Sequence, residues 1–407
     1  MAGREVRPYR LMHFLHVALL ITAWLIAFAW LYKLAEAARG LRTLPNLLTR
    51  AYDAAPERGP SVAVVVPARD EAASVAACLE SLIGQDYKNV RIVGVDDRST
   101  DQTGAIMDAL ALAHGARFEA IHIASLPAGR LGKTNAMAVA ARHAIATRNP
   151  DWLLFTDADV VFRPDALRRS LADATASRAD HFIVLPTTLA KTVGEALLLA
   201  YLQVIGMWAV RPWRVADPGA IRDAIGVGAF NLVRSTAYRR LGGFDAMPME
   251  ILEDLTLGRR VKRAGLRQRM AIAPGMISLH WAAGLRGIVS GLTKNAFAAF
   301  GFNAPLLLCA AAGMIALCLA PVAFLAVAGT RLPAAIALAS VAGLYVLTCR
   351  LTRISPVYAA LFPVGAAVAV YAMLRSMRIT LRDGGVTWRG TFYPLAELRR
   401  NADKNAK

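Results

Sequence analysis

The sequence predicts an α/β fold, with a mostly parallel central sheet covered by helices on both faces, and transmembrane helices at both ends of the chain. Between Ser61 and Gly301, short continuous apolar stretches alternate with helical segments, which is typical of a parallel sheet buried on both faces. Outside that region, apolar runs are long enough to cross the hydrocarbon core of a bilayer. Hydrophobic residues make up 56% of the 407 residues, which is too apolar for an ordinary soluble enzyme.

The chain is strongly basic, with 47 Lys and Arg residues against 29 Asp and Glu residues and a formal net charge of +18. No nucleic-acid recognition motif and no basic–aromatic stripe accompany this charge, so we expect no nucleic-acid partner. Anionic lipid headgroups and a phosphorylated substrate explain the excess at least as well. The four cysteines form no CxxC pair, which indicates neither a zinc site nor a disulfide framework.

Residues 1–35 are predicted to form an N-terminal transmembrane anchor. The run from Leu11 to Leu34 contains Lys33 and no other formally charged residue. It is too long for the apolar part of a signal peptide, and no clear small-residue cleavage site follows it. Residues 36–60 are predicted to be a linker.

Residues 302–376 are predicted to form a C-terminal transmembrane region with two or three spans. Its apolar runs are Pro305–Gly329, Pro333–Cys349 and Pro356–Leu374, of which the middle one is short for a span. A basic tail, residues 377–407, follows.

Residues 61–301 are predicted to form the α/β domain. Ser61–Val66 reads as a buried strand ending at Pro67, Val90–Val95 as the next strand, and Trp152–Thr156 as another. The helix between the first two strands is predicted over Ala72–Ile83. Open sheets of this kind bind ligands at the carboxyl ends of their strands, and polar clusters follow all three strands.

The pair Asp157 and Asp159 directly follows the third strand. Two carboxylates separated by one residue can bind one hard cation, and Mg²⁺ or Mn²⁺ takes oxygen ligands and bridges a diphosphate. A solvated turn with two acidic residues would give the same pattern.

Two further clusters stand at the ends of the other strands. Asp96 and Asp97 can accept hydrogen bonds from a nucleoside, while Ser99 or Thr100 is expected to cap the next helix. The stretch from Pro67 through Arg69 and Asp70 to Glu71 ends the first strand in the same way. The alternatives are an N-cap for Asp70 and an ordinary turn for Asp97, but three such clusters at one edge of one sheet favour a binding site.

Three more motifs lie further along the chain. Gly132 and Lys133 precede a helix, where a lysine and free backbone N–H groups can meet a phosphate, although the spacing of a P-loop is absent. Residues 226–231 read GVGAFN, in which small residues such as Gly228 let the backbone approach a ligand closely. Residues 250–258, which include Glu253 and Asp254, open an amphipathic helix, where acidic residues suit the helix dipole and a carboxylate can also serve as a general base.

Taken in order, the motifs P-x-x-D-E, DDRSTD, GK, TDAD, GVGAFN and LEDL resemble those of family 2 inverting glycosyltransferases with the GT-A fold. The resemblance covers roughly residues 61–300. The flanking spans and the tail from Val386 to Tyr393 are similar to lipid-directed members, such as ceramide glucosyltransferases and bacterial enzymes acting on hopanoid or carotenoid-type lipids. This resemblance implies Asp96 and Asp97 at the nucleotide, Asp157 and Asp159 at the metal, and Asp254 as base supported by Glu253.

One departure from the family pattern is informative. Processive members carry Q-x-x-R-W some forty residues after the base, whereas this chain reads GLTKN at residues 291–295. The missing tryptophan argues against polymer extension, and Lys294 is expected to contact the diphosphate. His280, beside Trp281, is either a structural histidine or an added metal or phosphate ligand.

The resemblance therefore implies transfer of one sugar from a nucleotide-diphosphate sugar, with UDP preferred, to a lipid hydroxyl at a bacterial inner membrane. Rival hypotheses are a polyprenyl-phosphate glycosyltransferase, a processive polysaccharide synthase, and a transporter or non-catalytic scaffold. The last would require charged residues within the spans, which are almost free of them. Cytosolic supply of the donor demands a cytosolic catalytic domain. Four spans would put the two ends of the chain on one side of the membrane and the catalytic domain on the other, yet the basic residues at both ends also favour the cytosol. One C-terminal run would therefore be re-entrant or interfacial.

Overall fold

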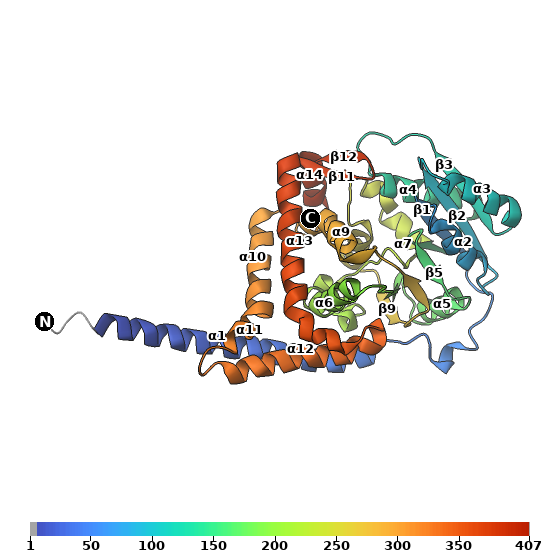
Figure 1. Ribbon diagram of the computed structural model, residues 1–407. Helices are drawn as coiled ribbons and strands as arrows, with labels where there is room; N and C mark the ends of the chain where they lie inside the picture. Colours follow the sequence, from blue (N-terminus) through green and yellow to red (C-terminus); the bar gives the residue numbers. More distant parts are fainter. Residues whose placement is uncertain (1–5, 407) are drawn as a thin grey trace.

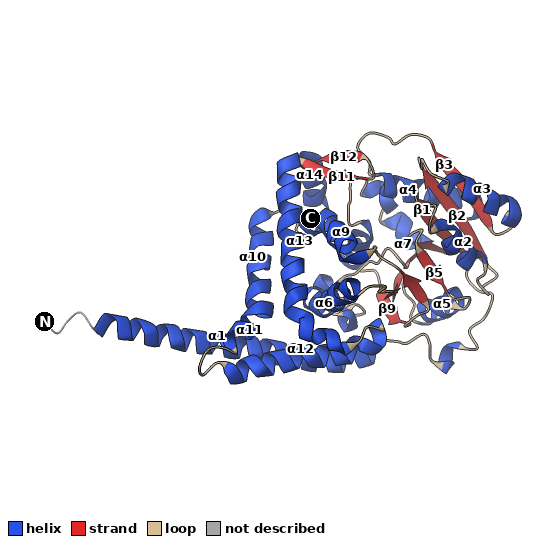
Figure 2. Cartoon of the chain, viewed as in Figure 1, coloured by secondary structure: helices blue, strands red, loops and turns tan. Residues whose placement is uncertain are grey.

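The computed structural model describes residues 6–406, so residues 1–5 of the predicted anchor and residue 407 of the predicted tail lie outside it. An α/β region and a group of long helices pack against each other (Figures 1 and 2). The α/β region holds a seven-stranded sheet in the order β3-β2-β1-β4-β8-β6-β9 and a three-stranded sheet in the order β5-β10-β7. The strands of both sheets are β1 (Val62–Ala68), β2 (Val90–Asp97), β3 (Phe118–Ile123), β4 (Trp152–Phe155), β5 (Val160–Phe162), β6 (His181–Leu185), β7 (Thr187–Thr188), β8 (Asn231–Arg234), β9 (Gln268–Ile272) and β10 (Ile277–Leu279).

The large sheet is mostly parallel, as predicted. Four neighbouring pairs are parallel, and β8 alone runs antiparallel to both of its neighbours, β4 and β6. Its interior strands are apolar on both sides because both faces are covered. In β1, Val64 and Val66 pack into one apolar cluster, whereas Ala63 and Val65 pack into another on the opposite face.

Two layers of helices cover these faces. One layer contributes α2 (Val75–Ile83), α3 (Thr103–His114) and α5 (Ala166–Ala176) to the first cluster. The other contributes α4 (Gly132–Arg148), α7 (Ser235–Arg240) and α8 (Glu253–Arg263) to the second cluster. The first strand, the helix after it and the second strand therefore form as predicted, with α2 beginning three residues later than expected.

The register of the strands brings the predicted polar clusters to one edge. Ala68 pairs with Asp96, so β1 and β2 end at nearly the same level, whereas Phe155, the last residue of β4, pairs with Val65, three residues before the end of β1. The residues that follow these strands, from Arg69, Arg98 and Thr156 onward, emerge at the same carboxyl edge of the sheet.

Five helical stretches within residues 6–406 are long and apolar enough to cross a membrane. They are Met12–Thr43, Val193–Arg214, Ala304–Phe324, Arg331–Thr352 and Pro356–Asp383. The helices within or beside them are α1 (Val6–Gly40), α6 (Val193–Ala209), α9 (Gly284–Ala299), α10 (Ala304–Met314), α11 (Ala320–Phe324), α12 (Arg331–Thr352) and α13 (Phe362–Asp383). In Figure 1, α1 runs alongside α12, and α13 packs against α9 and α10.

The second of these stretches was not predicted as a span. It lies inside the predicted α/β domain, but α6 packs with α1, α12 and α13 in the apolar core of the long helices. Its hydropathy pattern does not predict a span, because the stretch between Glu195 and Arg211 is shorter than 18 residues and is typical of a buried core helix.

The predicted basic tail has a regular structure. Helix α13 continues to Asp383, beyond the predicted end of the last span, and is followed by a hairpin of β11 (Gly385–Trp388) and β12 (Thr391–Pro394) and by α14 (Leu395–Ala406). Val386, Tyr393 and Leu398 pack in an apolar cluster with Phe297 of α9. The tail is therefore joined to the helix that carries Lys294.

Candidate active site

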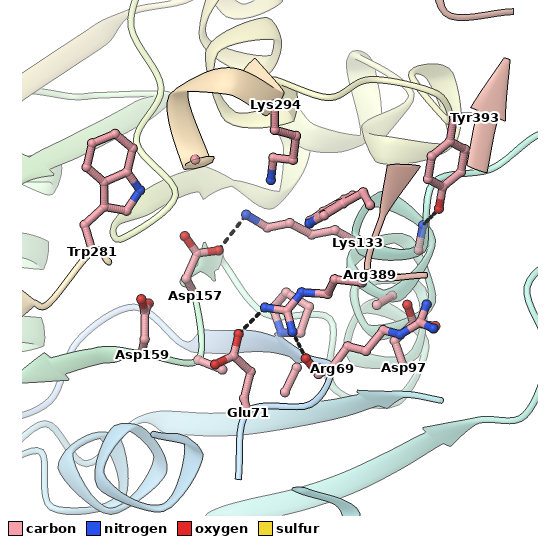
Figure 3. Close-up of a pocket in the computed structure, with 17 residues that line it drawn as sticks. Arg69, Glu71, Asp97, Lys133, Asp157, Asp159, Trp281, Lys294, Arg389 and Tyr393 are labelled. Carbon is pink, nitrogen blue, oxygen red and sulfur yellow. Dashed lines mark hydrogen bonds and ion pairs between the residues drawn. The ribbon is translucent and has the colours of Figure 1, made fainter. Parts of the chain in front are cut away.

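A cavity of about 300 Å³ opens at the carboxyl edge of the large sheet (Figure 3). Eight residues predicted to bind substrate or metal line it: Pro67, Arg69, Glu71, Asp97, Lys133, Asp157, Asp159 and Lys294. They come from five separate parts of the chain. A smaller cavity shares Lys133 and Asp157 with the first and is lined by three more predicted residues: Gly228, Glu253 and Asp254.

The loops after β1 and β2 are bonded to each other. The backbone N–H of Asp70 donates to Oγ of Ser99 (3.0 Å), and the N–H of Thr100 donates to Oδ1 of Asp70 (2.7 Å). The prediction that Ser99 or Thr100 caps the next helix is wrong, because α3 begins at Thr103, whose N–H donates to Asp101 (2.9 Å). The two loops therefore form one rigid rim of the cavity.

Asp96 and Asp97 have different surroundings. Asp97 lines the cavity and accepts two hydrogen bonds from Arg98, at 2.8 and 3.0 Å. The Asp96 carboxylate accepts from the N–H of Ser99 (3.0 Å) and lies 3.1 Å from Nδ1 of His122. Asp96 does not line the cavity, so in this structure it holds the rim loop in place.

Lys133 joins two acidic residues from distant elements. Its Nζ atom lies 2.6 Å from Oδ1 of Asp157 and 2.7 Å from Oε1 of Glu253. Burial opposes the charge on the lysine, but the two carboxylates outweigh burial and raise the Lys133 pKa well above its usual value. Lys133 is the second residue of α4, and the first, Gly132, also lines the cavity and donates its N–H to the hydroxyl group of Tyr393 (3.4 Å).

Asp157 and Asp159 fit a cation in part. Burial, together with the negative charges of Asp157 and Glu71, raises the pKa of Asp159 to about 6. Its buried Oδ1 atom has no hydrogen-bond partner, so this atom is available to accept a hydrogen bond or to bind a cation. Within residues 6–406 there is no cluster of three or more acidic, histidine or cysteine side chains placed to hold a metal. The remaining ligands of a cation here would therefore come from water or substrate oxygen atoms.

The glycines of the GVGAFN motif permit close packing beside these acidic residues. A Cβ atom on Gly228 would lie 2.5 Å from Oδ2 of Asp157, and one on Gly226 would lie 1.7 Å from the carbonyl oxygen of Asp254. A side chain at either position would push the motif away from Asp157 or from the first turn of α8.

Glu253 and Asp254 begin α8. Glu253 is buried and paired with Lys133, whereas Asp254 is half-buried and accepts a hydrogen bond from the N–H of Leu255 (2.7 Å). Burial and the neighbouring charge of Glu253 raise the pKa of Asp254 well above that of an ordinary aspartate. A carboxylate in this environment takes up a proton more readily.

The C-terminal hairpin contributes residues to the cavity that the motifs did not identify. Trp388, Arg389 and Tyr393 line it together with Trp281. The guanidinium group of Arg389 binds the Glu71 carboxylate and the carbonyl oxygen of Arg69 (Figure 3). The resemblance of the tail to lipid-directed enzymes was the only signal for these residues, and it named no role for them.

Lys294 lies in the same part of the cavity. Its Nζ atom is 4.2 Å from the centre of the Trp388 ring. Burial and the positive charge of Lys133 lower the pKa of Lys294 to about 8. His280, by contrast, does not line the cavity and lies 3.1 Å from the buried carboxylate of Glu195, in the role of a structural histidine.

Comparisons with known proteins agree with this architecture. Residues 63–191 match the family model described as Glycosyl transferase family 2. The chain is 27% identical over 217 residues to the Bacillus subtilis (strain 168) protein named "Putative glycosyltransferase EpsE", which covers 51% of this chain and 69% of that protein.

One solved structure shows a similar fold. The mannosyltransferase PcManGT from Pyrobaculum calidifontis, in complex with GDP-Man and Mn²⁺, aligns with a TM-score of 0.51 at 20% identity, over 88% of this chain and 99% of that one. TarS 1–349 of S. aureus in complex with UDP-GlcNAc aligns less closely, with a TM-score of 0.39 at 14% identity, over 82% and 96% of the two chains. The chain therefore has a GT-A-like α/β fold, and residues 63–191 of it match the glycosyl transferase family 2 model.

Proposed function

We propose that the protein is a membrane-anchored inverting glycosyltransferase that moves one sugar from a nucleotide-diphosphate sugar to the hydroxyl group of a lipid. The observation that carries this proposal is the Lys133 ion pair, which joins the Asp157 side of the cavity to the Glu253–Asp254 pair at 2.6 and 2.7 Å. It supports the proposal because it brings a lysine, which would stabilise a leaving group, next to acidic residues, one of which would accept a proton.

The donor diphosphate would lie among cations in the larger cavity. Three basic residues line this cavity: Lys133, Lys294 and Arg389. Their side chains can form charge-assisted hydrogen bonds with the oxygen atoms of two phosphates. Asp157 and Asp159 would hold Mg²⁺ or Mn²⁺, which supplies further electrostatic stabilisation of the departing nucleoside diphosphate. Asp97 and the rim loops, including Pro67 and Arg69, would position the nucleoside. UDP is preferred because of the family resemblance.

Asp254 would act as the general base. It takes the proton from the acceptor hydroxyl while the hydroxyl oxygen bonds to the anomeric carbon, and the bond to the diphosphate oxygen breaks on the opposite side. This displacement inverts the anomeric configuration. The raised pKa of Asp254 suits this role, because a base is most effective when its pKa lies near the working pH.

The arrangement of the helices supports a lipid acceptor. Helices α6 and α13, which lie in candidate spans, pack directly on α9, the helix that carries Lys294. An acceptor held in the bilayer could therefore reach the cavity without leaving the membrane. We accordingly propose a bacterial inner-membrane location with the site facing the cytosol, where nucleotide sugars are supplied.

The test compares purified Asp254→Asn with a matched Glu80→Gln variant, which changes an exposed acid on α2. We expect Asp254→Asn to bind UDP with Mn²⁺ as the wild type does but to lose transfer by at least about 10²-fold, and Glu80→Gln to keep it. Near-wild-type transfer by Asp254→Asn would refute the base assignment. Mild acid treatment of the lipid product separates the rival function, because a sugar linked to a polyprenyl phosphate is acid-labile and a sugar linked to a lipid hydroxyl is not.

A further inference from the structure

The C-terminal half of α13 has an outward face of apolar and basic side chains. Tyr371, Leu374 and Leu381 are exposed by 57%, 37% and 45%, and their spacing places them on one side of the helix. Arg375, Arg378 and Arg382 are exposed on the same side. The opposite side packs against α9 and α10 through small or apolar residues, among them Ala369, Ala372, Met373 and Ser376.

Two of these arginines lack a protein partner. Arg382 pairs with Asp383 at 2.7 Å, but within residues 6–406 neither Arg375 nor Arg378 makes a hydrogen bond or an ion pair. Asp383 is the only acid on the last three turns of the helix. The face therefore carries a net positive charge amid exposed apolar side chains, a combination that water solvates poorly.

The position of the face along the helix fits the boundary of a bilayer. Helix α13 belongs to the candidate span Pro356–Asp383, whose first half holds no charged residue. Arg375 and Arg382 are separated by about 10 Å along the axis at 1.5 Å per residue. This distance is comparable with the polar headgroup layer on one side of a bilayer, which is roughly 6–8 Å thick. Apolar residues would lie at the acyl chains and arginines at the phosphates.

We propose that this face of α13 binds anionic phospholipids, with the Arg375 and Arg378 guanidinium groups contacting the headgroup phosphates. Charge complementarity favours anionic over zwitterionic lipid, because a zwitterionic headgroup leaves the excess positive charge of the face uncompensated. Each basic residue near an anionic surface strengthens binding by about fivefold, so the pair contributes about 25-fold selectivity at low salt.

The test counts lipids retained by the purified full-length protein in mixed micelles of phosphatidylglycerol and phosphatidylcholine, by native mass spectrometry. The wild type should retain phosphatidylglycerol preferentially, and added salt should weaken that preference. The double variant Arg375→Gln/Arg378→Gln should lose most of the preference, whereas Arg375→Lys/Arg378→Lys should keep it.

The matched control is Arg58→Gln/Arg148→Gln, which removes the same charge from exposed sites on the α/β region and should behave as the wild type does. Equal retention of the two lipids by the wild type, or an equal loss in the control, would overturn the proposal. The proposal would also be overturned if Arg375→Gln/Arg378→Gln retained phosphatidylglycerol as the wild type does but lost a bound protein partner or a second copy of this chain. The readout uses no sugar donor, so its result is independent of the proposed enzymatic function.

Discussion

The Nζ atom of Lys133 lies 2.6 Å from Oδ1 of Asp157, so a cation from the chain itself neutralises one of the two aspartates expected to bind metal. The same ammonium group lies 2.7 Å from Glu253. Lys133 therefore compensates negative charge on both sides of the cavity. A diphosphate entering the cavity would compete for this ammonium group.

Replacing Lys133 should affect the chemistry more than the fold. Because Lys133→Met removes a positive charge aimed at the leaving group, we expect kcat/KM to fall by about 10²- to 10³-fold. Lys133→Arg should retain part of the activity, since it keeps the charge with a different shape. Steady-state transfer assays give the comparison.

Lys88→Met is the matched control for the lysine variants, because Lys88 forms only an exposed ion pair with Glu57, which contributes little. A Lys133→Met enzyme with wild-type kcat/KM would contradict the assigned role.

The pH dependence of kcat/KM should be bell-shaped. The raised pKa of Asp254 predicts that activity is lost on acidification at a higher pH than for an ordinary aspartate, because the base must be unprotonated. The Lys294 pKa of about 8 predicts that activity falls again above that pH, as the lysine loses the charge that attracts the donor. In Lys294→Arg the alkaline limb should move to higher pH while the acidic limb stays. An unchanged alkaline limb in this variant would exclude Lys294 as its origin.

The hairpin should contribute to donor binding through Arg389. Its guanidinium group bonds to Glu71 and to the backbone of Arg69 at the rim of the cavity. Arg389→Gln removes the charge, and we expect the KM for the donor to rise about tenfold, the effect of losing one charge-assisted hydrogen bond. Arg400→Gln, on the exposed side of α14, is the control and should leave KM unchanged. If Arg389→Gln also left KM unchanged, the hairpin would have no part in donor binding.

Local patterns in the sequence were sufficient to predict the parallel strands and the rim of the site. The apolar stretches that became β1, β2 and β4 are continuous, and polar residues follow each of them, so strand position and site position were both readable. The antiparallel β8 was not predicted as such. Strand direction depends on which neighbours it pairs with, and residues 231–234 alone do not encode that pairing.

Contacts between distant parts of the chain could not be predicted from local sequence patterns. Arg389 meets Arg69 across 320 positions of the chain, and the basic tail gave no indication that it folds back over the cavity. Similarly, Lys133 and Glu253 were each identified as candidates, but no motif joined them as an ion pair. The metal, the lipid acceptor and the individual catalytic roles stay predictions.

Acid stability should depend on His181, which lies buried in β6. Gln268 exchanges hydrogen bonds with the backbone of Ile225, and its Nε2 atom lies 2.8 Å from Nδ1 of His181. Since Nε2 of Gln268 can only donate, Nδ1 of the histidine must accept, and its other ring nitrogen donates to Oδ1 of Asn231. Burial lowers the pKa of His181 to about 4, and a protonated ring would place two donors face to face.

The unfolded chain, with a histidine pKa of about 6.5, binds more protons than the folded one between about pH 6.5 and pH 4, so stability falls as pH drops through this window. At pH 5 the loss from this residue is about 2 kcal/mol, or roughly 4–8 °C in the thermal midpoint of a domain of this size. His181→Gln can keep both hydrogen bonds without titrating, so its thermal midpoint should fall less between pH 7 and pH 5 than that of the wild type. Equal falls in the two proteins, measured by intrinsic fluorescence in one detergent, would show that His181 does not set the acid limit.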